Sequence, residues 1–233
     1  MQTVRIAVIG AGYWGTKLIR EYSLLSKSND VFLDSVVDVS TDRLNAAKAE
    51  LNSDDVNFLN DYGEVLRDSE IDAVHIAVPN HLHFETARMA LESGKHVLLE
   101  KPMTTSSRDA FKLAALSEEK GLVLQVGHIF RFNNALRKAR EITRTGELGK
   151  ILYSNLAWTM YMTPPSDRDI VFDLAPHPID VLNYLLDEWP IGLNAIGNSC
   201  LHGKAGREDI AFINLEFPDS VLANICVSWI QPG

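Results

Sequence analysis

TVRIAVIGAGYWG, residues 3–15, decides the fold of the first half of the chain. Residues 4–9 are a short run of apolar and β-branched side chains, which predicts a buried β-strand. Glycines then follow in the pattern G-x-G-x-x-G, and an amphipathic stretch over 13–26 predicts a helix. A strand, a glycine turn and a helix in this order are typical of a dinucleotide-binding site.

Each glycine of the turn has a physical task. Gly10 permits the tight turn, Gly12 lets the backbone approach a pyrophosphate, and Gly15 lets the helix lie close to the sheet. Asp38 ends the next predicted strand, 33–39, where a carboxylate accepts hydrogen bonds from the adenosine ribose and repels a 2′-phosphate. The pattern therefore predicts NAD as the cofactor. The alternative interpretation is a structural glycine turn with a capping aspartate.

Strands and helices alternate through the first half of the chain. This alternation predicts an α/β fold, with an N-terminal Rossmann domain over 1–127 and a doubly wound parallel sheet. The further strands are expected at 73–78, 96–99 and 123–126, and the helices at 43–51, 61–67, 82–93 and 106–120.

The pattern changes after Gly127. Three strand-like segments follow one another closely near the C-terminus, and the last two are joined by a short turn at 218–220. We therefore expect an α+β domain over 128–233 with a mostly antiparallel open sheet. Its helices are expected at 133–145 and 178–186, and its strands at 151–159, 193–201, 209–217 and 221–229.

Composition excludes several classes of function. The formal net charge is −9 without a stripe of Lys or Arg, which argues against nucleic acid as a partner. Cys200 and Cys226 have no C-x-x-C spacing, so we expect no disulfide framework, no metal site and a reducing, cytoplasmic location. Neither a signal peptide nor an apolar run of about 20 residues is found, so we expect no membrane association.

Two clusters could carry chemistry. Glu100, Lys101 and Pro102 follow a parallel strand at its C-terminal end, where ligands lie in open α/β sheets. Lys101 could aim its ammonium at a substrate oxygen near the nicotinamide, although a lone lysine is more often a solvated surface charge. Pro102 restricts the backbone of Lys101, and its own peptide bond could be cis or trans.

The second cluster is DLAPHPID, residues 173–180. His177 would lie in the first turn of a helix, where the dipole lowers the pKa of an imidazole and favours a neutral general base. Asp173 could orient that ring or bind substrate. Asp180 could support the site from behind, or be a first-turn carboxylate that the helix dipole favours. The alternative for His177 is a capping or packed histidine.

These residues resemble the Gfo/Idh/MocA family of oxidoreductases, named after glucose-fructose oxidoreductase and inositol dehydrogenase. The matching stretches are AVIGAGYWG, Asp38, VPNHLHFETARMALESGKHVLLEKPM, LQVGHIFRFNNALRKAREITRTGELGKI and DLAPHPIDVLNYLL. Ala175 and Pro178 depart from the residues that family members often have, Gly and Asp. Family members are usually longer, so we expect a partial C-terminal domain.

The resemblance implies a set of site residues. It implies that Lys101, Asp173 and His177 are catalytic and contact substrate. Arg131 would lie near the substrate or support the cleft, and Arg168 could contact substrate or nicotinamide. The residues placed at the cofactor are Gly10, Gly12, Tyr13, Trp14, Gly15, Asp38, Pro79, Asn80, His83, Glu100, Lys101 and Pro102.

The function implied is hydride transfer between NAD and a secondary alcohol or ketone of a sugar. Tyr13 and Trp14, with the DLxPH pattern, resemble members that act on nucleotide sugars, and inositol is a further possibility. Two alternatives stay open: a nonenzymatic NAD-binding regulatory protein, and a glycosidase that uses NAD transiently. The resemblance also implies a homo-oligomer, dimer or tetramer, formed through the C-terminal sheet.

Overall fold

The computed structural model describes residues 3–28, 30–165, 168–201 and 207–231. The chain divides into two compact units, Met1–Gly127 and His128–Gly233. Each unit has its own sheet and its own hydrophobic core.

The first unit is built on a six-stranded sheet in the order β3-β2-β1-β4-β5-β6, and neighbouring strands run parallel. The predicted doubly wound parallel sheet is confirmed. Its strands are β1 Val4–Ile9, β2 Val31–Val37, β3 Asn57–Leu59, β4 Ala73–Ile76, β5 His96–Leu99 and β6 Leu124–Val126. Its helices are α1 Tyr13–Leu25, α2 Thr41–Leu51, α3 Tyr62–Arg67, α4 His83–Glu92 and α5 Ser107–Lys120.

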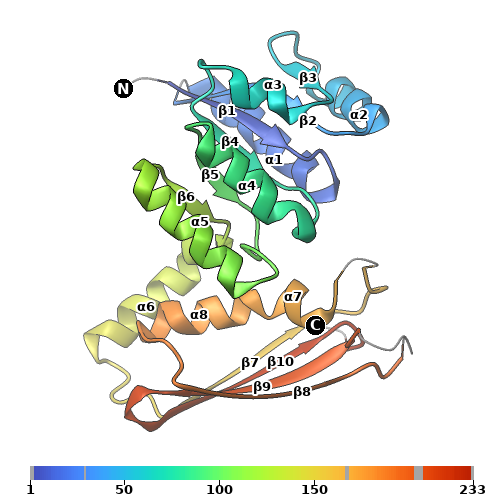
Figure 1. Cartoon of the computed structure of the whole chain (residues 1–233). Coiled ribbons are helices and arrows are strands. Elements are labelled where there is room, and N and C mark those ends of the chain that lie inside the picture. The colour runs from blue at the N-terminus through green and yellow to red at the C-terminus, as the bar shows by residue number, and fades with distance from the viewer. Residues whose placement is uncertain (1–2, 29, 166–167, 202–206, 232–233) are drawn as a thin grey trace. The chain divides into compact units, whose positions relative to one another are not determined.

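Alternation along β1 divides the core of this unit into two layers. Ala7 and Ile9 pack in one cluster with residues of α3, α4 and α5, such as Leu91 and Leu113. Val8 points to the other face and packs with α1 and α2. Helices therefore cover both faces of the sheet (Figure 1).

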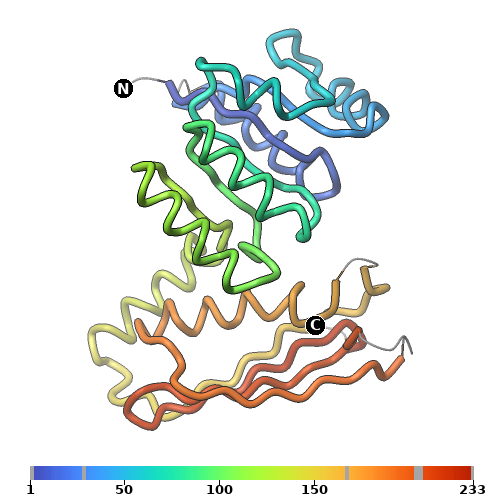
Figure 2. The backbone as a smooth tube through the Cα atoms, in the orientation of Figure 1, coloured from blue at the N-terminus to red at the C-terminus, as the bar shows by residue number. Residues whose placement is uncertain are grey.

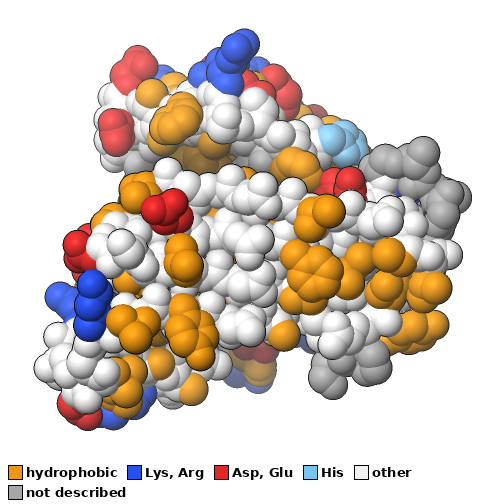
Figure 3. Space-filling model, turned by 90° about the horizontal axis from the view of Figure 1, so that it is seen from below, with side chains coloured by type: hydrophobic (Ala, Val, Ile, Leu, Met, Phe, Trp, Pro, Cys, Tyr) orange, Lys and Arg blue, Asp and Glu red, His pale blue; other side chains and the backbone are white. Residues whose placement is uncertain are grey.

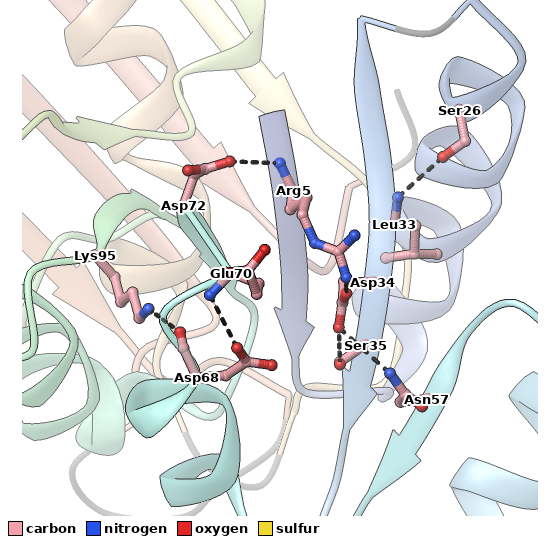
Figure 4. Close-up of polar contacts among 10 residues, drawn as sticks. All are labelled: Arg5, Ser26, Leu33, Asp34, Ser35, Asn57, Asp68, Glu70, Asp72 and Lys95. Atoms are coloured by element: carbon pink, nitrogen blue, oxygen red, sulfur yellow. Dashed lines mark hydrogen bonds and ion pairs between the residues drawn. The ribbon is translucent and has the colours of Figure 1, made fainter. Parts of the chain in front are cut away.

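Polar contacts connect the strands of this sheet near the N-terminal ends of β1, β4 and β5 (Figure 4). The backbone N–H of Arg5 donates to Asp72 at 2.8 Å, and its guanidinium pairs with the buried carboxylate of Asp34. The buried ammonium of Lys95 donates to the carbonyl oxygen of Asp68. Because the glycine turn follows the other end of β1, these contacts stabilise the sheet away from it.

The second unit has a four-stranded sheet in the order β7-β10-β9-β8. Two of its strand pairs are antiparallel, as expected, but β7 and β10 run parallel, which the sequence did not indicate. Its strands are β7 Tyr153–Thr159, β8 Gly192–Asn198, β9 Ile210–Phe217 and β10 Val221–Ser228. Its helices are α6 Asn134–Thr145, α7 Ile170–Leu174 and α8 Pro176–Leu186, which lie over one face of the sheet (Figure 2).

The two faces of the second sheet differ in burial. Along β9, alternate residues such as Ile213 and Leu215 are buried in a core with α7 and α8. The opposite face carries one asparagine from each strand in register, and the amide of Asn224 donates to that of Asn214 at 2.8 Å. This asparagine row consists of Asn155, Asn224, Asn214 and Asn194.

Exposed apolar side chains flank the asparagine row. Tyr153 and Leu222 pair on one side of it, and Phe212 and Ile196 pair on the other. Figure 3 shows apolar side chains gathered on the face of the molecule seen from below. Among the described residues, no helix has the length and apolar character needed to span a bilayer.

Candidate functional site

The glycine turn has the geometry that its sequence predicts. Gly10 adopts φ +106°, and a Cβ there would lie 2.5 Å from the carbonyl oxygen of Ala77. A Cβ on Gly15 would collide with the carbonyl group of Gly10, whereas a Cβ on Gly12 would meet nothing within 4 Å. Gly10 and Gly15 therefore serve close packing, and Gly12 leaves open space at the first turn of α1. The first N–H groups of a helix have no partner inside the helix, so they are available to an anion here.

Asp38 follows β2 and is buried beside this turn. Its carboxylate accepts the backbone N–H of Ala11 and that of Ser40, each at 2.8 Å. A guanidinium nitrogen of Arg43 lies 3.5 Å away. A carboxylate has about four lone-pair directions, so Asp38 retains capacity for the ribose hydroxyls that the sequence predicts as its partners.

Tyr13 and Trp14 open helix α1 beside the turn. The side chain of Tyr13 is 82% exposed, and the ammonium of Lys17 lies 3.0 Å from its hydroxyl. The hydrogen bond from Lys17 lowers the pKa of Tyr13. The same ammonium also lies 5.1 Å from the ring centre of Trp14, which is a cation–π contact.

Glu100 lies directly after β5 and is buried. Burial acts to raise its pKa, but His75, the indole of Trp14 and the backbone N–H of Lys101 outweigh burial, so the pKa is lowered. The peptide bond between Lys101 and Pro102 is cis. Trp14 and Glu100, two predicted cofactor residues, therefore interact electrostatically although they are far apart in the sequence. Nε1 of Trp14 has no hydrogen-bond partner among the described residues.

Asn80 and His83 come from the segment that follows β4. Both side chains are buried, and the amide nitrogen of Asn80 has no hydrogen-bond partner among the described residues. The ring nitrogens of His83 lie 2.7 Å from the carbonyl oxygen of Pro102 and 2.9 Å from that of Val78. Burial lowers the pKa of His83, although both carbonyl groups oppose this. His83 thus connects the segments after β4 and β5 from inside.

These features fit a bound dinucleotide. Gly12 provides open space at a helix N-terminus, Asp38 is a buried acceptor, and Asn80 has an unsatisfied buried donor. An orphaned buried donor costs about 1–3 kcal/mol, which a ligand carbonyl would relieve. Among the described residues, no cluster of His, Cys, Asp and Glu is arranged to hold a metal ion.

His177 lies in the second unit, in the first turn of α8. Its ring stacks on Trp158 with centroids 5.6 Å apart and meets the edge or face of Phe130 at 5.1 Å. Phe130 and Trp158 contact each other as well, at 4.7 Å. The ring of His177 is therefore oriented by two aromatic neighbours that the sequence analysis did not identify.

Asp173 and Arg168 are brought together in this unit. Nε of Arg168 lies 3.4 Å from the carboxylate of Asp173, whose side chain is 14% exposed. Helix α7, which carries Asp173, was not expected from the sequence. The side chain of Asp169 caps this helix by accepting the N–H of Phe172 at 2.9 Å.

Arg131 binds the buried carboxylate of Asp180 through two nitrogens, with its shortest contact at 2.6 Å. The hydrogen bonds to Asp180 raise the pKa of Arg131. The guanidinium of Arg131 is thus bound to α8, and its two interpretations, substrate contact and support of the cleft, both stay predictions. Asp180 is correspondingly the partner of Arg131.

A strand, a glycine turn and a helix with a buried aspartate after β2 define a dinucleotide-binding protein of the Rossmann class. A family model described as an oxidoreductase family with an NAD-binding Rossmann fold matches residues 4–128. A model of the GFO/IDH/MocA C-terminal domain matches residues 136–233. The chain belongs to the Gfo/Idh/MocA family of oxidoreductases, and its N-terminal unit is an NAD-binding domain.

Curated relatives are identical to this chain at somewhat more than a quarter of the aligned positions. A 2,7-anhydro-N-acetylneuraminate hydratase of Mediterraneibacter gnavus is 26% identical, covering 94% of this chain and 60% of the relative. A UDP-N-acetylglucosamine 3-dehydrogenase of Acidithiobacillus ferrooxidans is 29% identical, covering 97% and 67%. The chain thus spans about three fifths to two thirds of the length of these relatives.

Solved structures share the fold. A scyllo-inositol dehydrogenase from Lactobacillus casei with bound NAD(H) and scyllo-inositol has a TM-score of 0.85 at 22% identity, covering 99% of this chain and 71% of that protein. A probable dehydrogenase from Thermotoga maritima has a TM-score of 0.86 at 27% identity, covering 98% and 69%.

Proposed function

We propose that this chain is part of an NAD-dependent oxidoreductase that moves hydride between nicotinamide and a secondary alcohol or ketone of a sugar, a nucleotide sugar or an inositol. The observation that carries this proposal is the buried carboxylate of Asp38, bound to the N–H of Ala11 in the glycine turn. Family membership supports the reaction class, and relatives named as a UDP-N-acetylglucosamine 3-dehydrogenase and a myo-inositol 2-dehydrogenase support the substrate classes.

The proposed chemistry divides between four side chains. NAD, when bound, supplies the hydride acceptor. His177 takes the proton of the substrate hydroxyl as general base, held by its stacking on Trp158. Lys101 donates a hydrogen bond to the same oxygen and stabilises developing negative charge. Asp173 orients a substrate hydroxyl or the ring of His177, and Arg168 beside it contributes positive charge.

NADH absorbance with a panel of inositols, UDP-sugars and dTDP-sugars tests the proposal. Replacing Lys101 or His177 with Ala should lower turnover by about 100-fold or more, because each removes a group that acts on the reacting oxygen. Lys112→Ala is the matched control, since Lys112 forms an exposed pair with Asp109 on α5. If both active-site variants keep full activity, the assigned roles are wrong.

A second candidate is a lyase or hydrolase reaction that uses NAD without net reduction. One relative is named a hydratase, and addition of water requires no net oxidation. Mass spectrometry of the products would then show a changed sugar while NADH does not accumulate. NAD binding with no product of either kind would instead indicate a regulatory protein.

We also propose that the open face of the second sheet binds a second copy of this chain. Amide groups both donate and accept hydrogen bonds, so the asparagine row can pair with its own copy across a two-fold axis. The exposed Leu222 and Phe212 on either side would bury apolar area in the same contact. A cytoplasmic location is proposed with it, because Cys200 and Cys226 are both free thiols.

A further inference from the structure

Three polar side chains in the first unit form a chain of hydrogen bonds, in which Tyr22 is half-buried and His75 and Glu100 are buried. The hydroxyl of Tyr22 on α1 lies 2.9 Å from Nδ1 of His75 on β4, and the two rings meet edge to face at 83°. Nε2 of His75 lies 3.3 Å from the carboxylate of Glu100, which follows β5. His75 is 3% exposed and Glu100 is 8% exposed, so water competes little for these contacts.

The donor and acceptor at each of these hydrogen bonds follow from the two end groups, the carboxylate of Glu100 and the hydroxyl of Tyr22. An ionised carboxylate can only accept, so Nε2 of His75 carries the hydrogen that faces Glu100. Nδ1 of a neutral imidazole is then an acceptor, and the hydroxyl of Tyr22 donates to it. Burial raises the pKa of Tyr22 to about 12, so the phenol keeps the proton that it donates.

Glu100 connects these hydrogen bonds to the residues around its carboxylate. The indole of Trp14 and the backbone N–H of Lys101 act with His75 to lower the pKa of this carboxylate, although Nε1 of Trp14 has no hydrogen-bond partner among the described residues. Gly127, which follows β6, leaves the space that the carboxylate occupies, since a Cβ there would lie 3.1 Å from Oε1. The carboxylate of Glu100 is thus bound by His75 on β4 and lies in the space that Gly127 leaves after β6.

We propose that Tyr22 and His75 are positioning residues, which hold Glu100 and, through it, the backbone of Lys101 at the nicotinamide end of the cofactor site. This inference rests on the proposed function for the place of the nicotinamide. The Tyr22–His75–Glu100 chain itself is a property of the folded protein, and it can be tested without cofactor or substrate.

The first test is the ¹⁵N spectrum of the histidine rings in the whole chain. It reports which nitrogen of each ring carries hydrogen, and the His75→Gln variant assigns the His75 signals. We expect the hydrogen on Nε2, and we expect the Nδ1 signal to move in Tyr22→Phe because its donor is lost. Hydrogen on Nδ1, or an unchanged Nδ1 signal in Tyr22→Phe, overturns the proposal.

The second test compares binding of NADH with binding of ADP-ribose, which lacks the nicotinamide. Tyr22→Phe should weaken NADH by about tenfold, the effect of one hydrogen bond to a charged network, and ADP-ribose by less than twofold. Tyr62→Phe is the matched control, since the hydroxyl of Tyr62 donates a weak hydrogen bond to the sulfur of Met89, at 3.6 Å, and does not take part in the chain to Glu100.

The outcomes separate this proposal from the proposed function. Equal weakening of both ligands by Tyr22→Phe would indicate a general structural role and overturn the positioning role. The same holds if Tyr62→Phe reproduces the NADH effect. Failure of the unmodified chain to bind NADH would instead count against the proposed function, while the ¹⁵N result would still decide whether the hydrogen-bond chain exists.

Discussion

Ionisation of the Tyr22 phenol should make the stability of the first unit depend on pH in the alkaline range. Burial, with the charge of Glu100, raises its pKa from 10.0 to about 12. The unfolded chain releases this proton near 10 and the folded chain holds it longer, so stability should fall as the pH rises from 10 towards 12. Denaturant unfolding measured across that range should show a shallower decline in Tyr22→Phe.

Tyr161→Phe is the control for this experiment, because Tyr161 is 73% exposed. It should leave the alkaline decline as steep as in the unmodified chain. If Tyr22→Phe declines as steeply as the control, the phenol of Tyr22 is not buried as described.

The roles of some residues can be predicted from the sequence, whereas the contacts of others cannot. Gly10, Gly15 and Asp38 could be assigned because one local pattern sets both their spacing and their task. Tyr22 and His75 are 53 positions apart, and each alone looks like a core residue, so only the fold reveals their contact. The aromatic contacts of His177 were missed for the same reason.

At the scale of elements, Arg131 and Asp180 connect the segment before α6 to helix α8. Removing the guanidinium in Arg131→Met leaves a buried carboxylate without its main partner, so the second unit should lose about 1–3 kcal/mol of stability. Urea unfolding followed by tryptophan fluorescence measures this loss. A loss within about 0.5 kcal/mol, the scale of surface substitutions, would mean that the pair contributes little.

Arg137→Met provides the comparison for that variant. Nε of Arg137 donates to the backbone carbonyl of Arg131 at 3.3 Å from an exposed position on α6. Its replacement should therefore shift the unfolding midpoint much less than Arg131→Met does.

Most elements were predicted to within a few residues, including the short strands β5 and β6. Strand β3 and helix α7 were missed, since they have three and five residues, too few for a period to show. The parallel pairing of β7 with β10 was also missed, because adjacent strands in sequence favour hairpins and β7 pairs with a strand far along the chain. Which strands pair depends on the path of the chain between them, and local sequence patterns do not determine that path.

At the scale of the whole molecule, the open sheet face should control self-association. Asn214→Asp with Asn224→Asp keeps the shape of the asparagine row but adds like charges that a symmetric contact would bring together. Sedimentation equilibrium should show association of the unmodified chain and a shift towards monomer in the double variant. Asn45→Asp, on the exposed side of α2, should associate as the unmodified chain does.

A monomeric unmodified chain, or a double variant that associates equally well, would contradict the proposed contact. The sequence predicted the two sheets, whereas the use of the second sheet in self-association, which the family resemblance implies, stays a prediction. It did not predict the asparagine row, since the register that aligns four strands is set only when β7, β10, β9 and β8 assemble.

The three glycines of the turn differ in what surrounds them, and this has an evolutionary consequence. Gly10 and Gly15 are enclosed by backbone, so selection for folding alone should retain both in a randomised library. Gly12 has no neighbour within 4 Å of a Cβ, so the same selection should let it drift to alanine. Selection for cofactor binding should retain all three glycines. Gly12 is therefore the position at which selection for folding and selection for function should give different results.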